Sequence, residues 1–587
     1  MKGSRTSAPA GSVLGLSALS HDPAACLFID GRLVGAVEEE RLNRQKRTLA
    51  FPHRSIDWLL RQGGLASLAD VDLVSYYWDD RGQVPSMLQG SAAPLRHDPV
   101  GMGRHVARRL SAAVRAPGQL RRELAAHCGD PASLPRIVYV PHHEAHLAAA
   151  LHSAPADCGA ALIIDGRGEC AATSLFDLRG RSGPRLLERY DFPHSLGVFY
   201  GAATQALGYT PISDEYKVMG LASYGCASRS AAQAVNRLLR VAADGRYRLD
   251  LGLLQPENCS PGARSWLSAS GRELLTGDFW DSDGRPTQEA RDFAFAVQQR
   301  LEEAVLGLVR RLVGRTGARR ISVVGGVAMN ARAIGRIRES GLVDDVHVPL
   351  APTDAGACIG AALWALNPGG GAPADRVSLS DPFLGPGYTD EEIERLLIRS
   401  RWPYTRLDDP AAAAAHAIAA GHVVGWFDGR LEFGDRALGA RSILGDPRDA
   451  ATRERMNTLV KRRETYRPFA PSVLEEHAAE YFSLAVSRRM GEICDVHERM
   501  RDRIPAVVHV DGTARPQTVP RDFSLPSYRR LVECFLAETG VPMVVNTSFN
   551  VKDEPIVCSP EDALRCFATS GLERLFLGPF LVTKGAP

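Results

Sequence analysis

Two histidines four residues apart carry the clearest chemical signal in the chain. His142 and His146 follow a short β-branched and aromatic run and Pro141, and the residues after them are small and apolar. Because proline is tolerated in the first turn of a helix, the pattern predicts a helix that begins near Pro141 and carries both imidazoles on one face. Two imidazoles one turn apart make half of a site for a divalent first-row metal. Surface histidines at a helix N-terminus are the alternative.

A metal site needs further ligands, and carboxylates that follow two apolar strands are candidates for them. Asp165 follows the run 160–164 and precedes Gly166, and Asp354 follows a predicted strand over 345–349 and opens a helix of small residues. Glycine beside a carboxylate lets the backbone approach a metal or phosphate closely. Two histidines with two carboxylates suit iron(II), manganese or zinc better than magnesium. An ordinary Asp-Gly turn is the alternative for Asp165.

The N-terminal region predicts the beginning of a nucleotide-binding fold. Three short apolar runs lie within residues 13–37, and the turn Asp30-Gly31 separates the second from the third. An Asp-Gly pair between two such runs is a strong hairpin signal. Domains of the actin and sugar-kinase type begin with strand, tight turn and strand, and their loops face the ligand. His21 and Lys46 are therefore candidate active-site groups, although Lys46 could also be a solvated charge in a basic cluster.

Two further patterns indicate phosphate binding. Gly325-Gly326 separates a predicted strand from a helix, where backbone N–H groups can meet phosphate oxygens. In the second half of the chain, Arg436, Arg467 and Arg515 sit among Gly, Pro and aromatic residues instead of on a charged helix face. Arginine offers planar, bidentate donors to phosphate. Solvated surface arginines are the alternative.

Length and composition limit the class of protein. A chain of 587 residues predicts about two to four domains. The net charge of +2 gives no general electrostatic reason for binding nucleic acid or an anionic membrane, and no apolar run approaches the ~20 residues that span a bilayer. The 11 cysteines are scattered without a C-x-x-C pair, which is typical of reduced thiols. We therefore expect a cytoplasmic protein without nucleic-acid or membrane partners.

A segment dense in Gly and Pro at 367–375 is the best candidate linker. We predict a first domain over 12–368, a linker over 369–380 and a second domain over 381–587.

Nine motifs in order give the chain a resemblance to the O-carbamoyltransferases of the nodulation-factor and antibiotic type, from Gly15 to Lys584. These motifs are His21-Asp22-Pro23-Ala24-Ala25, Glu38-Glu39-Glu40-Arg41, His142-His143-Glu144-Ala145-His146, Asp165-Gly166-Arg167-Gly168-Glu169, Lys217-Val218-Met219-Gly220-Leu221-Ala222, Gly325-Gly326-Val327-Ala328, Arg436-Ala437-Leu438-Gly439, Tyr466-Arg467-Pro468-Phe469-Ala470-Pro471 and Asn546-Thr547-Ser548-Phe549-Asn550. The resemblance implies an α/β protein with an actin/sugar-kinase-like N-terminal domain of two ribonuclease-H-like halves. A smaller YrdC-like α/β domain would follow it.

The resemblance also implies a reaction. Carbamoyl phosphate and ATP, used with Mg²⁺, would give carbamoyl-adenylate in the C-terminal domain. The carbamoyl group would then pass to a hydroxyl of a small-molecule natural product at an Fe(II) or similar metal site in the N-terminal domain. The enzyme would be a monomer or homodimer.

Four groups of residues match the family's sites. His142, His146, Asp165 and Asp354 match the metal site, and His21 and Lys46 match positions near the carbamoyl group. Residues at the nucleotide or carbamoyl-adenylate in the N-terminal domain would be Gly166, Gly168, Glu169, Lys217, Gly325, Gly326 and Asn330. Residues at carbamoyl phosphate and ATP in the C-terminal domain would be Arg436, Lys461, Arg467, Arg515, Asn546 and Ser548.

Two positions depart from the family pattern, and other functions stay open. Asp435 replaces a usual proline, and Arg167 occupies a usually variable, often apolar position.

A kinase or ATPase of the actin/sugar-kinase group, without carbamoyl chemistry, is the main alternative to the carbamoyltransferase function. A carbamoylation factor acting on a macromolecule and a non-catalytic sensor are the others.

Overall fold

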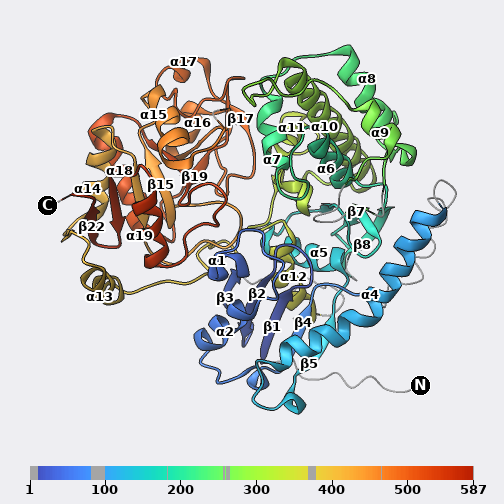
Figure 1. The fold of residues 1–587 in the computed structure, drawn as a ribbon, viewed down its shortest axis with the longest axis horizontal. Helices are drawn as coiled ribbons and strands as arrows, with labels where there is room; N and C mark the ends of the chain where they lie inside the picture. The colour runs from blue at the N-terminus through green and yellow to red at the C-terminus, as the bar shows by residue number, and fades with distance from the viewer. Residues whose placement is uncertain are drawn as a thin grey trace. The chain divides into compact units, whose positions relative to one another are not determined.

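The chain divides into two units of mixed α and β structure. The computed structural model describes residues 11–80, 99–180, 183–255, 258–259, 265–367, 379–464 and 466–585 (Figure 1). Unit 1 comprises Met1–Glu39, Arg47–Met329 and Arg336–Ser380, and unit 2 comprises Glu40–Lys46, Asn330–Gly335 and Asp381–Pro587. Most of the predicted linker over 369–380 lies outside the described residues. The domain bounds therefore stay a prediction.

The first sheet of unit 1 has five strands in the order β3-β2-β1-β4-β5. Its strands are β1 (Ser12–Ser17), β2 (Ala24–Ile29), β3 (Arg32–Glu38), β4 (Leu73–Tyr76) and β5 (Arg136–Tyr139). The first three strands are antiparallel, and β1, β4 and β5 run parallel. The Asp30-Gly31 turn joins β2 to β3 with both residues at positive φ, which confirms the predicted hairpin.

The second sheet of unit 1 repeats this topology. Its strands are β6 (Ala160–Ile164), β7 (Ala171–Asp177), β8 (Arg185–Asp191), β11 (Arg320–Val324) and β12 (Asp345–His347), in the order β12-β11-β6-β7-β8. Again the first three strands in sequence are antiparallel, and the first, fourth and fifth run parallel. Two sheets with this shared order are two ribonuclease-H-like halves, so the predicted actin/sugar-kinase-like fold is confirmed.

Two helices meet where the halves join. Helix α5 (His142–Ser153) packs against β6 and β11 of the second sheet, whereas α12 (Asp354–Leu366) packs against β1, β2 and β4 of the first sheet. The two helices also pack against each other, and Figure 1 shows them side by side. Gly360 makes this approach possible, because a Cβ there would lie 1.8 Å from the carbonyl oxygen of Ala145. The first residues of both helices carry predicted metal ligands.

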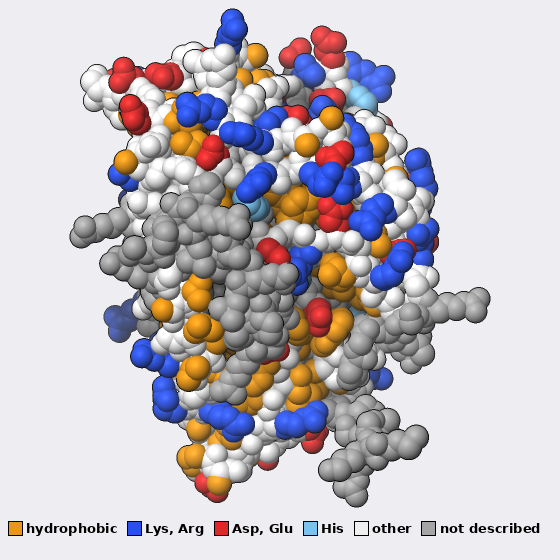
Figure 2. All heavy atoms as spheres, turned by 90° about the vertical axis from the view of Figure 1, so that its right-hand side faces the viewer, with side chains coloured by type: hydrophobic (Ala, Val, Ile, Leu, Met, Phe, Trp, Pro, Cys, Tyr) orange, Lys and Arg blue, Asp and Glu red, His pale blue; other side chains and the backbone are white. Residues whose placement is uncertain are grey.

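The remaining helices of unit 1 cover the outer surfaces. They are α2 (His53–Gln62), α4 (Pro99–Ala125), α6 (Leu196–Ala206), α7 (Glu215–Ala222), α8 (Arg229–Leu238), α9 (Ala269–Leu274) and α10 (Gln288–Thr316). Two helices each contain residues of both units: α1 (Glu39–Asn43) and α11 (Ala331–Glu339). A separate two-stranded antiparallel ribbon is formed by β9 (Leu239–Val241) and β10 (Tyr247–Leu249). On the face shown in Figure 2, basic side chains are interspersed with acidic ones.

Unit 2 contains an eight-stranded mixed sheet in the order β13-β22-β21-β14-β15-β20-β16-β19. Its strands are β13 (Tyr404–Arg406), β14 (Val424–Phe427), β15 (Arg441–Gly445), β16 (Ala470–Leu474), β19 (Gln517–Val519), β20 (Met543–Ser548), β21 (Arg574–Leu577) and β22 (Phe580–Thr583). A small hairpin of β17 (Cys494–Asp495) and β18 (Thr513–Ala514) is separate. The helices are α13 (Asp390–Ser400), α14 (Pro410–Ala419), α15 (Ala450–Arg455), α16 (Ala478–Tyr481), α17 (Glu498–Arg501), α18 (Pro526–Thr539) and α19 (Pro560–Thr569). Its likeness to YrdC stays a prediction.

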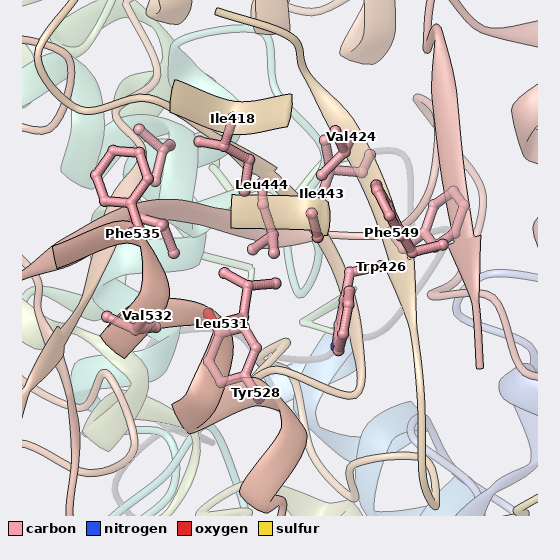
Figure 3. Close-up of a cluster of buried hydrophobic side chains, with 14 of the residues drawn as sticks. Ile418, Val424, Trp426, Ile443, Leu444, Tyr528, Leu531, Val532, Phe535 and Phe549 are labelled. Atoms are coloured by element: carbon pink, nitrogen blue, oxygen red, sulfur yellow. The ribbon is translucent and has the colours of Figure 1, made fainter. Parts of the chain in front are cut away.

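The core of unit 2 forms where helices pack on this sheet. Figure 3 shows Ile418 of α14 and Leu531 and Phe535 of α18 beside Trp426 and Leu444 of the sheet, and all five belong to one buried cluster. Burying side chains of this size contributes about 1.5–3 kcal/mol each. In the described part of the chain, no helix is both long and apolar enough to cross a bilayer, and all 11 cysteines are free thiols.

We expect Gly360→Ala to destabilise unit 1 by about 1–3 kcal/mol, because the added methyl group would overlap the Ala145 carbonyl and push α5 from α12. The midpoint of urea unfolding measures this change. Gly314→Ala is the matched control, since Gly314 lies in α10 and a Cβ there meets nothing within 4 Å. The control should leave stability unchanged or raise it by up to about 1 kcal/mol. Equal effects of the two substitutions would contradict the close helix contact.

Candidate functional site

The four predicted metal ligands meet in one buried cluster of unit 1. One donor atom from each of His142, His146, Asp165 and Asp354 lies within 4.8 Å of every other. His142 Nε2 is 2.8 Å from Asp165 Oδ2 and 3.5 Å from Asp354 Oδ1, and it is 3.1 Å from His146 Nε2. The four residues are at most 6% exposed. His143, which the sequence places on another face, hydrogen-bonds Ser174 Oγ through Nδ1 at 2.7 Å.

The local structure explains why these side chains converge. His142 and His146 lie on the first turns of α5, and the Asp354 side chain starts α12, so the helix contact at Gly360 brings them together. Asp165 follows β6 directly. The backbone N–H groups of Gly166 and Gly326 donate to its Oδ1 at 2.7 and 3.3 Å, which leaves Oδ2 directed at the histidines.

Glu169 fixes the start of α5. Its Oε1 accepts hydrogen bonds from the backbone N–H groups of His142 at 2.9 Å and Asp79 at 2.7 Å, and the side chain is buried. A carboxylate at a helix N-terminus satisfies unpaired N–H groups and interacts well with the helix dipole. The structure gives Glu169 this positioning contact, and the predicted role of Glu169 at the nucleotide stays a prediction.

The two carboxylates of the cluster raise the pKa of two nearby histidines. For His146, burial alone would lower the pKa, but hydrogen bonds to Asp165 and Asp354 outweigh it and raise the pKa to about 9. Burial also opposes protonation of His21, yet the charges of Asp354, Asp22 and Asp165 raise the pKa of His21 to about 10. His21 Nε2 lies 3.8 Å from Asp354 Oδ2. Two buried carboxylates that draw protons onto two histidines form a site that suits a cation.

The donor set fits a divalent metal. Two imidazole nitrogens and two carboxylate oxygens, with Nε2 and oxygen atoms 2.8–3.7 Å apart, can point at one ion at ordinary ligand distances of about 2.0–2.2 Å. The Nδ1 atoms of both histidines are buried and have no hydrogen-bond partner among the described residues. The residues therefore could hold a metal ion, and the identity of the ion stays open.

Two aromatic residues at the cluster had not been predicted. The Tyr77 hydroxyl donates to Asp354 Oδ2 at 3.4 Å, and burial together with Asp354 raises the pKa of Tyr77 well above its usual range. The Trp78 ring lies 4.9 Å from the His142 ring, centroid to centroid. The run Tyr76-Tyr77-Trp78-Asp79, which starts at the last residue of β4, was a sequence signal for these aromatic contacts.

The glycines predicted at the nucleotide lie around the same cluster. Gly168 leaves room for the histidines, because a Cβ there would be 3.2 Å from His142 Cδ2. Gly325 has φ +97°, and a Cβ there would lie 2.4 Å from the carbonyl oxygen of Ile164.

Lys217 pairs with Asp214 at 3.2 Å. Asn330 belongs to unit 2, where its Oδ1 accepts from the Ala333 N–H at 3.0 Å.

A basic cluster occupies unit 2. Arg436, Arg467 and Arg515 come from three separate loops, and Arg463 joins them. Burial lowers the pKa of Arg515 well below its usual range, and the positive charges of Arg436, Arg463 and Arg467 lower it further. Burial likewise lowers the pKa of Arg436, with a contribution from Arg467. Guanidinium groups held this close to one another suit a polyanion.

Lys461 is anchored beside these arginines. It ends a π-helix over Met456–Lys461, and its ammonium group donates to the Ser548 carbonyl oxygen, to Ser548 Oγ at 3.2 Å and to Asn550 Oδ1 at 2.6 Å. Burial lowers the pKa of Lys461 well below its usual value, and Arg463, Arg467 and Lys46 add to this. π-helical turns occur frequently at functional sites.

The structure gives the surroundings of three further predicted positions. Lys46 belongs to unit 2, close enough to Lys461 to affect its pKa, whereas His21 lies at the histidine–aspartate cluster of unit 1. Asn546 Nδ2 donates to Ser472 Oγ at 2.9 Å and to the Ala437 carbonyl oxygen at 3.2 Å, so it supports the loop of Arg436. The roles predicted for Lys46 and Asn546 stay predictions.

The departures Asp435 and Arg167 also have defined places. Asp435 is exposed. Its negative charge raises the pKa of Arg436, in opposition to burial. The Arg167 guanidinium lies 5.5 Å from the centre of the Phe192 ring.

Comparison with known proteins identifies the family. Residues 12–363 match the model of the carbamoyltransferase N-terminus, and residues 415–584 match that of the carbamoyltransferase C-terminus. The chain belongs to the carbamoyltransferase family. It is an enzyme that transfers a carbamoyl group.

Relatives of this carbamoyltransferase include two nodulation proteins. It is 38% identical to nodulation protein NolNO of Sinorhizobium fredii over 577 residues, covering 96% of this chain and 79% of the relative. It is 38% identical to nodulation protein NolO of Bradyrhizobium diazoefficiens over 454 residues, covering 76% of this chain and 78% of the relative. Protein sll1178 of Synechocystis sp. is 36% identical over 98% of this chain and 97% of its own length.

We expect Asp354→Asn to lower the affinity of the carbamoyltransferase for a divalent metal by more than the roughly 10–100-fold that loss of an outer hydrogen-bond partner costs. The substitution removes a charged ligand while keeping the shape of the side chain. Metal content after dialysis, measured by atomic emission, reports the loss. His143→Gln is the matched control on the same helix, because His143 faces Ser174. Full metal retention in Asp354→Asn would contradict the ligand assignment.

Proposed function

We propose that this carbamoyltransferase is an ATP-dependent O-carbamoyltransferase. In unit 2, water would hydrolyse carbamoyl phosphate to carbamate and phosphate. The carbamate oxygen would then attack the α-phosphorus of ATP to give carbamoyl-adenylate, and pyrophosphate would leave. A hydroxyl group of a small-molecule natural product would then attack the carbamoyl carbon in unit 1, and AMP would leave. The observation that carries the proposal is that one chain holds two sites of opposite charge, a basic cluster and a buried histidine–aspartate cluster.

The basic cluster of unit 2 supports the adenylate-forming half of the proposal. ATP and carbamoyl phosphate are both polyanions, and guanidinium groups bind phosphate through paired N–H donors. The charge of Arg467 contributes to lowering the pKa of Arg436 and of Arg515, so a bound polyanion would relieve the repulsion among these groups. Lys461 and Ser548 would lie at the same phosphates, because the Lys461 ammonium group contacts Ser548 Oγ.

The histidine–aspartate cluster supports the transfer half. A bound divalent metal such as Fe(II) supplies Lewis-acid polarisation of an oxygen. His142, His146, Asp165 and Asp354 would hold it, while Glu169, Gly166 and Gly326 orient these ligands.

His21 would handle the proton of the acceptor hydroxyl. Beside uncompensated carboxylates its pKa of about 10 makes it a proton donor at neutral pH. Neutralisation of Asp354 and Asp165 by a cation would bring the pKa back toward its ordinary value, and in that state the imidazole can accept a proton.

We expect Arg467→Ala to lower the rate of pyrophosphate release from ATP in the presence of carbamoyl phosphate by about 10²-fold or more, because it removes a charged donor to the reacting phosphates. Synthetic carbamoyl-adenylate should restore carbamoyl transfer to an acceptor in this variant. Arg521→Ala is the control, since Arg521 is an exposed arginine of the same unit. Failure of carbamoyl-adenylate to restore transfer would contradict the assignment of Arg467.

The double substitution His142→Ala and His146→Ala should abolish carbamoyl transfer but leave pyrophosphate release intact, because it removes ligands in unit 1 alone. Both steps are measured in one reaction mixture, by pyrophosphate assay and by mass spectrometry of the acceptor. Loss of pyrophosphate release would contradict the division of labour. A kinase or ATPase without carbamoyl chemistry would instead turn over ATP at the same rate with and without carbamoyl phosphate.

A further inference from the structure

A second pair of histidines lies in unit 1, apart in sequence from the cluster described above. His53 is the first residue of α2, and His127 follows the C-terminal end of α4. His53 Nδ1 and His127 Nε2 face each other at 2.8 Å. The backbone also ties this region together, since the Leu68 N–H donates to the His127 carbonyl oxygen at 2.9 Å.

Each imidazole has a carboxylate at its outer nitrogen. His127 Nδ1 lies 2.7 Å from Asp57 Oδ1, and His53 Nε2 lies 3.2 Å from Glu123 Oε2. The contacts cross between the elements, because Asp57 belongs to α2 and Glu123 to α4. Two elements are therefore joined by a chain of four side chains, carboxylate–imidazole–imidazole–carboxylate.

This chain leaves two acceptor nitrogens facing one another. An ionised carboxylate only accepts hydrogen bonds, so it selects the tautomer whose outer nitrogen carries the proton. With both outer nitrogens protonated, His53 Nδ1 and His127 Nε2 each present a lone pair at 2.8 Å, which is repulsive unless a positive centre lies between them. Histidine ligands of metals generally donate their second N–H to a carboxylate, carbonyl or water, and here both do so.

Charge and access favour a divalent ion at this point. Asp57 and Glu123 bring two negative charges to a neutral pair of imidazoles, which balances one divalent cation. The His53 side chain is 42% exposed, whereas that of His127 is 5% exposed, so the pair combines a fixed ligand with one that solvent reaches. The Nε2 atoms of His142 and His146 lie at a similar 3.1 Å, and a small rotation of His53 would open the second pair to the distance of two nitrogens on one ion.

We propose that His53 and His127 form a second, peripheral site for a divalent transition metal of the zinc class, with water completing the coordination. Asp57 and Glu123 position the two ligands. An ion bound there would link the N-terminus of α2 to the segment that follows α4, and so hold the end of α4 to the first half of unit 1.

The test counts zinc in the full chain. Wild type and His53→Gln are equilibrated with ZnSO₄, desalted and analysed by atomic emission, and the variant should carry one equivalent of zinc fewer per chain. Asp57→Asn should bind this equivalent roughly 10–100-fold more weakly in competition with a chromophoric chelator. His416→Gln is the matched control, because His416 Nδ1 contacts the carboxylate of Glu538 at 3.0 Å in a surface pair of one histidine and one carboxylate.

Thermal unfolding separates metal binding from a structural hydrogen bond. Zinc should raise the Tm of wild type more than that of His53→Gln, and the two proteins should unfold at the same temperature in EDTA. Equal zinc content in wild type and His53→Gln, or an equal loss in His416→Gln, would overturn the proposal. A lower Tm of His53→Gln in EDTA, with no difference in zinc content, would show instead that the imidazoles share only a proton.

Discussion

The interaction on which unit 1 depends is the burial of two carboxylates against two imidazoles. Ions buried without partners cost several kcal/mol each, so Asp165 and Asp354 can be this close only where positive charge compensates them. The surrounding structure holds the four side chains in place instead of separating them. Two backbone N–H groups fix one oxygen of Asp165, Glu169 fixes the start of α5, and the absence of a side chain at Gly360 lets α12 approach. The duplicated fold supplies this place because helices α5 and α12 both begin there.

Unit 2 presents the reverse electrostatic problem. Its arginines come from separate loops, and the buried network of Asn546, Ser472 and Gln517 supports one of these loops through the hydrogen bond from Asn546 to the Ala437 carbonyl oxygen. The arginines and lysine repel one another, and so this part of the chain is ready for a ligand with several negative charges. The proposed ATP-dependent reaction would need both environments, because phosphate binding requires positive charge whereas binding a metal cation requires negative charge.

Local patterns in the sequence were enough to predict the hairpin at Asp30-Gly31, the helix after Pro141 and the strand before Asp165, since each depends on short-range periodicity and turn chemistry. The meeting of His142, His146, Asp165 and Asp354 also followed, because strand ends and helix starts gather at one edge of such sheets. Contacts that depend on tertiary packing could not be predicted this way. Nothing in the spacing of Glu169 indicated that it would bind the N-terminus of α5, and nothing near Lys46 indicated that it would join unit 2. The raised pKa of His21 depends on the neighbouring Asp22 but also on Asp354 and Asp165, which are more than 140 positions away.

The path of the backbone has a consequence for how such an enzyme can evolve. Residues 40–46 and 330–335 belong to unit 2, although both segments are flanked by residues of unit 1. Arg44, for example, donates to the carbonyl oxygens of Pro555 and Ile556, and Ile493 donates to Ala331. A gene fragment beginning near codon 381 would thus encode a unit 2 that lacks residues 40–46 and 330–335. Exchange of C-terminal modules between members of the family by simple recombination would break these contacts, so the two units are expected to be inherited together.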